Sequence, residues 1–120
     1  MQCGNAKFSI QDVRKLEFRE DLKDQFDVAI CCEVIEHILD DFKLIEDISR
    51  CLKPGGRLLL TTPNYFYNAI SEDDKGPFCN EETGWHVRRG YSKGMLLEVC
   101  KASGLVIEEI SYCSFFFVKK

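Results

Sequence analysis

Two apolar runs separated by one amphipathic segment constrain the fold of this chain more than any other feature of its 120 residues. Phe26–Cys32 reads FDVAICC and residues 57–62 read RLLLTT, which is typical of parallel strands covered on both faces. Between the two runs, apolar residues recur at helical spacing over residues 40–52. A strand, a helix and a second strand predict a right-handed crossover, and therefore an α/β fold with a mostly parallel sheet.

The ends of the predicted helix carry signals of their own. Asp40 and Asp41 stand at its start, where carboxylates interact favourably with the N-terminal dipole. The K-P-G-G run at residues 53–56 stops it, because proline cannot continue a helix and glycine supplies the backbone angles of a tight turn.

The remaining segments complete an alternating pattern. The predicted elements are a short strand at residues 7–13, a loop with a helical turn at 14–25, a helix at 92–103 with Ser92 as its N-cap, and a strand at 105–118. The stretch 65–89 is long and irregular, and such a loop is usually a functional lid or a flexible segment. In parallel sheets ligands bind outside the carboxyl ends of the strands, so the residues that follow each predicted strand are the first candidates for a site.

Charge and composition argue against several classes of protein. The net charge of −4 disfavours a nucleic-acid binder, which normally shows a basic surface. The sequence has no apolar run of about 18 residues, the length a membrane helix needs. Residues 1–5 lack the charged and apolar regions of a signal peptide. We therefore expect a cytoplasmic protein without a nucleic-acid or membrane partner.

Seven cysteines are present, but no C-x-x-C pair occurs, which argues against a zinc ribbon or a redox motif. We expect the cysteines to be reduced and assign no metal site. A zinc site built from Cys31, Cys32, His37 and His86 is the alternative, although the spacing of these residues matches no structural zinc pattern.

Two linked motifs make the chain similar to a known family. The first is the strand Phe26–Cys32 followed by E-x-x-E-H, here Glu33, Glu36 and His37. The second is the K-P-G-G turn, which opens the next strand sixteen residues after His37. Together they resemble the second half of class I S-adenosylmethionine-dependent methyltransferases, in the small-molecule branch that includes quinone-biosynthesis enzymes.

The resemblance implies a Rossmann-like class I methyltransferase fold, S-adenosylmethionine as the cofactor and a small-molecule acceptor. Asp12 and Val13 match positions that contact the adenine of the cofactor in the family. Cys32 matches a position at the methionine end of the cofactor. Glu33 and His37 match residues that border the same pocket.

The chain also departs from the family pattern. It contains no G-x-G, whereas the family cradles its cofactor in a glycine-rich loop after the first strand. The match begins at the third strand of the family, so the fold is expected to be truncated at the N-terminus, with the first two strands missing. We therefore expect a homodimer, or a second chain that supplies the missing N-terminal half.

Two histidines are candidates for a general base, since an imidazole of ordinary pKa accepts a proton at neutral pH. His86 would act on the acceptor, with Arg88 or Arg89 binding an acidic group of that acceptor. The alternative is that His86 is hydrogen-bonded to the backbone and Arg88 is a solvated charge. His37 is expected to cap or orient the loop before the helix.

Three other side chains have open roles. Glu33 faces the ammonium or ribose of the cofactor, or it pairs with Arg57 or a lysine. Glu36 is expected to be a surface or capping carboxylate. Tyr65 either walls an apolar acceptor pocket or seals the edge of the core.

The favoured function is S-adenosylmethionine-dependent methyl transfer to a small molecule by a single partial domain at residues 1–120. The absent glycine loop leaves an alternative open, which is a non-catalytic fragment or interaction module. A nucleotide-dependent oxidoreductase is disfavoured, because it would also need a glycine loop to cradle phosphate.

Overall fold

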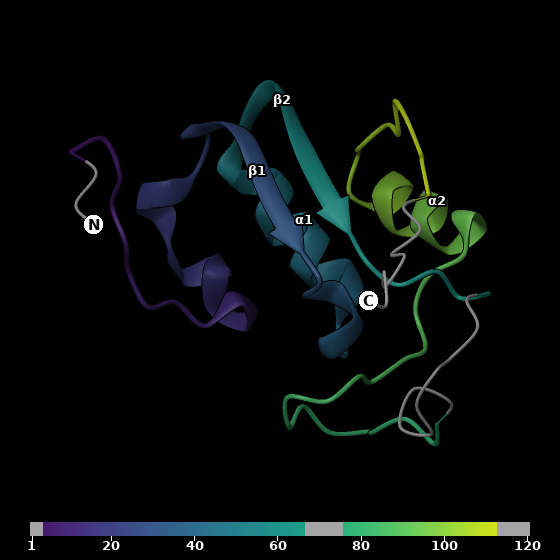
Figure 1. Ribbon diagram of the computed structural model, residues 1–120. Helices are drawn as coiled ribbons and strands as arrows, with labels where there is room; N and C mark the ends of the chain where they lie inside the picture. Colours follow the sequence, from purple (N-terminus) through teal and green to yellow (C-terminus); the bar gives the residue numbers. More distant parts are fainter. Residues whose placement is uncertain (1–3, 67–75, 113–120) are drawn as a thin grey trace, which may run out of the picture.

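A parallel strand–helix–strand unit forms the centre of this computed structural model, which describes residues 4–66 and 76–112 (Figure 1). Its elements are strand β1 (Phe26–Cys32), helix α1 (Asp41–Cys51) and strand β2 (Leu52–Thr61). β1 and β2 pair in parallel, with Ile30 opposite Leu59. The predicted α/β unit is therefore confirmed in this part of the chain.

Four further elements accompany the central unit. They are the 3-10 helices η1 (Val13–Phe18), η2 (Glu20–Leu22) and η3 (Ile35–His37), and the helix α2 (Lys93–Ala102). The loop before α2, described from residue 76 to residue 91, is called the α2 loop below. The helix predicted at residues 92–103 is confirmed as α2, and the side chain of Ser92 accepts a hydrogen bond from the backbone N–H of Met95 at 3.3 Å.

Strand β2 begins five residues earlier than the sequence pattern predicts. Leu52 pairs with Phe26 and Arg57 pairs with Val28, with a register shift between the two pairs. The K-P-G-G run fills this shift, and Gly55 adopts a φ of 82°. The run thus bends the strand as a bulge, whereas the sequence predicted a turn that precedes it.

Helix α1 owes its ends and its orientation to local chemistry. The Asp40 side chain accepts a hydrogen bond from the backbone N–H of Lys43 at 3.1 Å, which confirms the predicted N-terminal signal. Leu44 and Ile45 are buried on the face toward the sheet. Asp47 is buried as well, and its carboxylate is paired with Lys43 at 2.7 Å and Arg50 at 3.1 Å.

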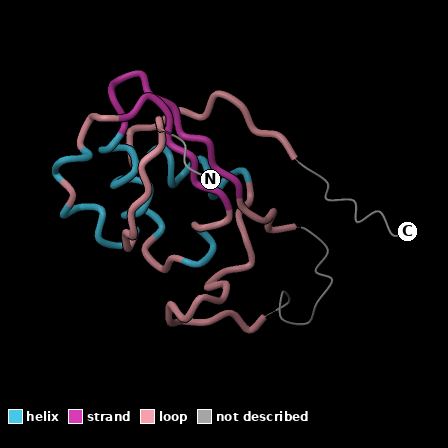
Figure 2. The backbone as a smooth tube through the Cα atoms, turned by 60° about the vertical axis from the view of Figure 1, so that its left-hand side comes forward, coloured by secondary structure: helices cyan, strands magenta, loops and turns pink. Residues whose placement is uncertain are grey.

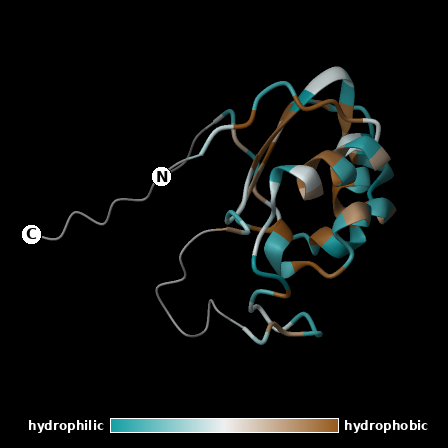
Figure 3. Cartoon of the chain, turned by 90° about the vertical axis from the view of Figure 1, so that its right-hand side faces the viewer, coloured by the Kyte–Doolittle hydropathy of each residue, from teal (hydrophilic) through white to brown (hydrophobic). Residues whose placement is uncertain are grey.

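The hydrophobic core lies on one side of the sheet. Its buried members are Ile35, Leu44, Ile45, Tyr91 and Val99, with Leu58 and Leu60 of β2 packed against them. α1 and α2 lie on the same side of the strands, as Figures 2 and 3 show. The opposite face of the sheet carries apolar side chains in contact with solvent. They are Val28, Ile30 and Leu59, which are 56, 68 and 56% exposed. We call these three residues the open face.

The prediction of a strand at residues 7–13 is wrong. Residues 7–12 form no strand, and Val13 begins η1. Phe8 and Ile10 are 88% and 104% exposed, so the alternation that suggested a strand buries nothing here. The physical reason is that a strand needs a neighbour for its backbone groups, and within the described ranges β1 pairs only with β2.

The last predicted strand, at residues 105–118, does not form over residues 105–112. Residues 105–112 belong to no strand, and residues 113–118 lie outside the described residues. Among the helices that the structure describes, none has the length and apolar character needed to cross a bilayer.

Candidate functional site

The loop after β1 carries the E-x-x-E-H motif and starts with an unusual backbone angle. Glu33 has a φ of 53°, in the left-handed region, and its N–H donates to the Thr61 carbonyl oxygen at 2.9 Å. This bond closes the carboxyl ends of β1 and β2 and turns the chain into η3. Residues with positive φ that are not glycine are uncommon and often mark functional loops.

Glu36 is almost completely buried, at 1% exposure, so the expectation of a surface or capping carboxylate is wrong. Its Oε2 accepts a hydrogen bond from the Thr62 hydroxyl at 3.1 Å. Its backbone oxygen accepts one from the N–H of Val87 at 2.9 Å, which ties the motif to the α2 loop. A carboxylate is tolerated inside a protein when it has such partners.

The pKa of Glu33 is raised by its own partial burial and by Glu36. Partial burial raises the pKa of Glu33, and the hydrogen bond and charge of Glu36 raise it further. The charges of His86 and His37 act in the opposite direction. The expected pair between Glu33 and Arg57 does not form, because Arg57 pairs with Glu108 at 3.1 Å.

The two histidines of the chain meet beside Glu36. The rings of His37 and His86 lie edge to face, with centroids 4.7 Å apart and planes at 76°. Nε2 of His37 is 3.7 Å from Oε1 of Glu36. The Nδ1 atoms of both histidines are buried and have no hydrogen-bond partner among the described residues. Two imidazole nitrogens of the site are thus left without a hydrogen-bond partner in the described part of the fold.

Glu36, His37 and His86 have ligand atoms that all lie within 4.8 Å of one another. Imidazole and carboxylate at this spacing are able to share one divalent cation. The zinc site considered from the sequence is not assembled, since neither Cys31 nor Cys32 belongs to this group. We call these three residues the Glu–His–His cluster.

The α2 loop is joined to the end of β2 by backbone contacts. Tyr91 donates its N–H to the Pro63 oxygen at 2.9 Å, and Tyr65 donates to the Tyr91 oxygen at 3.1 Å. Gly90 lies so close to Pro63 that an added Cβ would be 2.9 Å from the Pro63 carbonyl carbon. The segment that follows His86 is therefore held firmly against the strand end.

The other three residues expected to bind cofactor, beside Glu33 and His37, lie in two different surroundings. Val13 and Cys32 line a hollow of about 400 Å³ between η1, β1 and α1, and all other side chains that line it are apolar. Asp12 is engaged elsewhere: the hydrogen bonds from the Arg14 side chain at 2.7 and 2.9 Å hold the pKa of its carboxyl well below the usual range.

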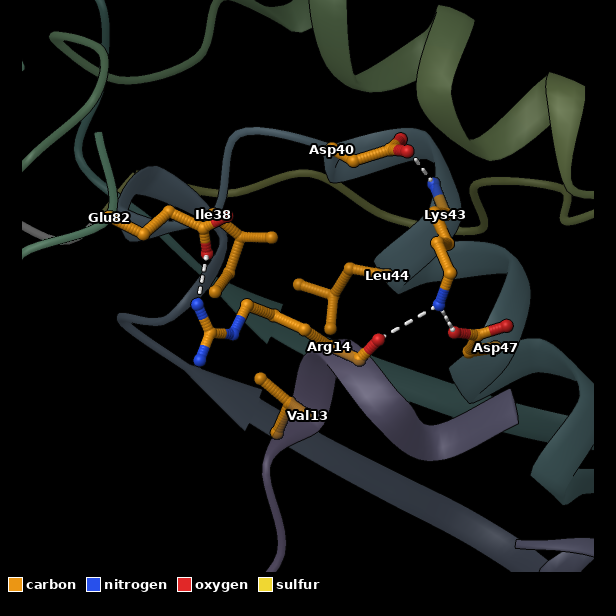
Figure 4. Close-up of a pocket in the computed structure, with 8 residues that line it drawn as sticks. All are labelled: Val13, Arg14, Ile38, Asp40, Lys43, Leu44, Asp47 and Glu82. Atoms are coloured by element: carbon orange, nitrogen blue, oxygen red, sulfur yellow. Dashed lines mark hydrogen bonds and ion pairs between the residues drawn. The ribbon is translucent and has the colours of Figure 1, made fainter. Parts of the chain in front are cut away.

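Figure 4 shows how η1 is fastened to α1 and to the α2 loop. Nζ of Lys43 donates to the Arg14 carbonyl oxygen at 3.0 Å and to Oδ2 of Asp47 at 2.7 Å. The Arg14 guanidinium lies 3.8 Å from a carboxylate oxygen of Glu82 in the α2 loop. A cavity of about 70 Å³ remains between these side chains. Val13, which lines both spaces, is thus fixed by links to α1 and to the α2 loop.

The two residues expected to bind the acceptor lie in different surroundings. Tyr65 is 43% exposed and packs edge to face on Phe66, with ring centroids 5.2 Å apart. Arg88 is mostly covered, and its guanidinium donates to the backbone oxygens of Ile35 and Ile38 at 2.8 and 2.6 Å. Direct binding of an acceptor by either residue stays a prediction.

The two neighbouring cysteines of β1 are expected to differ in reactivity. Cys31 is buried, and burial, with the charges of Glu36 and Cys32, raises its pKa to about 11. At pH 8 about one Cys31 thiol in a thousand is then ionised, whereas Cys32 is exposed. We expect iodoacetamide to modify Cys32 at least about tenfold faster than Cys31, and Cys31 to become reactive as the pH rises toward 11.

Peptide mass spectrometry of two single variants measures this difference. In Cys32→Ser the peptide should stay unmodified until denaturant is added, and in Cys31→Ser it should be modified in the folded chain. Equal rates in the two variants would contradict the buried position of Cys31.

Comparisons with known proteins point in one direction. A family profile described as "Methyltransferase domain" matches residues 4–110. The ubiquinone biosynthesis O-methyltransferase of Aeromonas salmonicida is 33% identical over 111 residues, which cover 88% of this chain and 46% of that protein. The enzymes of the same name from Pseudomonas paraeruginosa and Pseudomonas syringae pv. tomato are 40% and 38% identical over 48 residues, 40% of this chain and 21% of theirs.

These matches leave part of each relative uncovered. The chain spans less than half the length of the curated relatives it matches. No solved structure shows a significant match.

Proposed function

This chain belongs to the family of methyltransferase domains, and on that premise we propose that it serves S-adenosylmethionine-dependent methyl transfer to a small-molecule acceptor. The observation that carries the proposal is the Glu–His–His cluster. It joins the E-x-x-E-H motif to a histidine about fifty residues later in the chain, at the carboxyl end of the parallel strands. That edge is where ligands bind in open α/β sheets.

The hollow beside β1 is suited to part of the cofactor. Its volume lies in the range of small-molecule sites, and its apolar walls, including Val13 and Cys32, suit a flat purine ring. Glu33 directly follows Cys32, and its carboxylate would face the ammonium or ribose. Asp12 would join them through lone pairs that Arg14 leaves free. His37 would border the methionine end.

Bound S-adenosylmethionine supplies an activated methyl group, and the chain supplies alignment and proton acceptance. His86 is the proposed general base, because its Nδ1 has no hydrogen-bond partner among the described residues. Glu36 and His37 would hold the His86 ring in place. Tyr65, half exposed at the end of β2, would form a wall of the acceptor site.

A partner for the open face is also proposed. The outer edge of β1 has no strand beside it in the described ranges, and the open face exposes three large apolar side chains. An unpaired strand edge, such as the outer edge of β1, readily accepts an added strand. A second copy, or a chain that supplies the rest of a methyltransferase domain, would complete the sheet. The alternative of a non-catalytic interaction module rests on the same surface.

Calorimetric titration with S-adenosylhomocysteine tests the proposal. We expect micromolar binding by the 120-residue chain, about tenfold weaker binding by Glu33→Gln, and binding within about threefold of the wild type by His86→Gln, since a base for the acceptor need not hold the cofactor. Sedimentation of the same samples shows whether the binding species is a monomer or a dimer.

The outcomes are distinct. Absence of heat in a folded sample would reject cofactor binding by this chain alone and favour the interaction module. Binding that is lost equally in both variants would reject the separate roles of Glu33 and His86. If the cofactor binds, a transferred methyl group that disappears only with His86→Gln supports the base.

A further inference from the structure

Arg88 connects two segments that are far apart in the sequence. One Nη donates to the backbone oxygens of Ile35 at 2.8 Å and Ile38 at 2.6 Å, and the other donates to that of Leu39 at 2.9 Å. These partners lie 49 to 53 residues before Arg88. The Ile35 oxygen also accepts the N–H of Ile38 at 3.2 Å, and Arg88 adds a second donor to it. The planar guanidinium supplies several donors in one fixed fork.

The Arg88 side chain is itself held in position. Its guanidinium lies over the Tyr91 ring, 5.6 Å from the centroid, and 4.0 Å from Oδ2 of Asp41. The Tyr91 hydroxyl donates to the same carboxylate oxygen at 2.7 Å. Burial and this hydrogen bond raise the pKa of Tyr91, so that it stays a neutral donor. The orientation of the fork is therefore fixed before any ligand arrives.

Both segments joined by Arg88 carry a histidine of the Glu–His–His cluster. Glu36 and His37 lie inside the stretch whose carbonyl oxygens Arg88 binds, and His86 is two residues before Arg88. Among the described residues, the backbone bond between the two segments runs from the Val87 N–H to the Glu36 oxygen, at 2.9 Å. Together with this bond, the three Arg88 bonds hold the segments that carry the two rings.

We propose that Arg88 is a positioning residue that sets the separation and angle of the His37 and His86 rings. This proposal rests on the proposed methyl transfer for its catalytic meaning, but the geometry is testable without it. Lysine would keep the charge and lose the fork, because an ammonium cannot present the same set of planar donors. Arg88→Lys is therefore expected to behave as a loss, and not as a conservative change.

The two histidines are the only ones in the chain, which makes nuclear magnetic resonance of their rings decisive. In the wild type we expect a nuclear Overhauser effect between the ring protons of His37 and His86, assigned with His37→Gln and His86→Gln. In Arg88→Lys we expect that signal to fall at least about threefold. The matched control is Arg57→Lys, since the Arg57 side chain is 74% exposed and pairs with Glu108 at 3.1 Å.

Full retention of the ring signal in folded Arg88→Lys would overturn the proposal. If that variant does not fold, the proposal is tested on the wild type alone, through the proton signals of the Arg88 guanidinium. The Arg88 Nη protons should then give separate, slowly exchanging signals, because three carbonyl bonds stop rotation of the guanidinium. A freely rotating guanidinium would reject the proposal.

Activity adds a second reading where the proposed function holds. We expect Arg88→Lys to lower kcat for methyl transfer by at least about tenfold with the KM for S-adenosylmethionine within about twofold, since a displacement of about 1 Å can cost a hundredfold in rate. A change in KM alone would contradict positioning. A wild-type chain that transfers no methyl group rejects the proposed function and leaves the resonance experiment to judge Arg88.

Discussion

Gly90→Ala is expected to cost at least about 3 kcal/mol of unfolding free energy, a large fraction of the total stability of a small domain. Gly90 is buried and has a φ of 149°, a conformation that side-chain-bearing residues rarely adopt. The new Cβ would meet the Pro63 carbonyl group and lie 3.2 Å from the carbonyl carbon of Asn64. Neither segment can move away, because Tyr91 donates its N–H to Pro63 at 2.9 Å.

Gly94→Ala is the matched control. Gly94 lies in α2, and an added Cβ would find only the Ser92 hydroxyl, at 4.0 Å. Alanine is favoured over glycine in a helix by about 1 kcal/mol, so this variant should be slightly more stable than the wild type. Urea denaturation followed by circular dichroism measures both. A Gly90→Ala chain within about 1 kcal/mol of the wild type would disprove the close approach.

Ile45→Ala is expected to cost about 2 to 5 kcal/mol, the range seen when a buried aliphatic side chain is truncated. Ile45 is completely buried on α1 and belongs to the core with Leu44 and Ile35. The cost should fall near the upper end, because all of this core lies on one side of a two-stranded sheet and few other contacts compensate.

Phe42→Ala on the same helix is the matched control. Phe42 is 44% exposed, so its loss should cost less than about 1 kcal/mol although more atoms are removed. Ile45→Val, which removes one methylene group, should fall between them at about 0.5 to 1.5 kcal/mol. Equal losses for Ile45→Ala and Phe42→Ala in urea denaturation would contradict the assigned core.

The sequence allowed prediction of what depends on neighbours along the chain. The strand Phe26–Cys32 and the N-cap at Ser92 depend on local periodicity and local hydrogen bonds, and both are confirmed. The strand at residues 7–13 shows the same alternation, but it needs a partner strand that no local pattern reveals. This prediction failed because the segment has no strand to pair with, although its local pattern suits a strand.

The candidate site was predictable in its parts but not in its assembly. His37 and His86 were identified as separate candidates, and their meeting depends on bonds from the α2 loop to η3. Glu36 was misjudged because a lone carboxylate is normally exposed, and its partner Thr62 comes from a distant strand end. The close spacing of Glu36 and His37 in E-x-x-E-H was the one local signal that could have placed it in the site.

The carbonyl bonds of Arg88 also join segments that are about fifty residues apart, and we expect such contacts to form after the local ones. The β1–α1–β2 unit makes contacts over short stretches of chain, whereas the histidine pair requires a loop of about fifty residues to be shut first. The bonds that secure this contact belong to no regular helix or sheet, so we expect the amides near His86 to exchange with solvent faster than those of α1. We therefore expect the contact between the two imidazoles to open to solvent before the β1–α1–β2 unit unfolds.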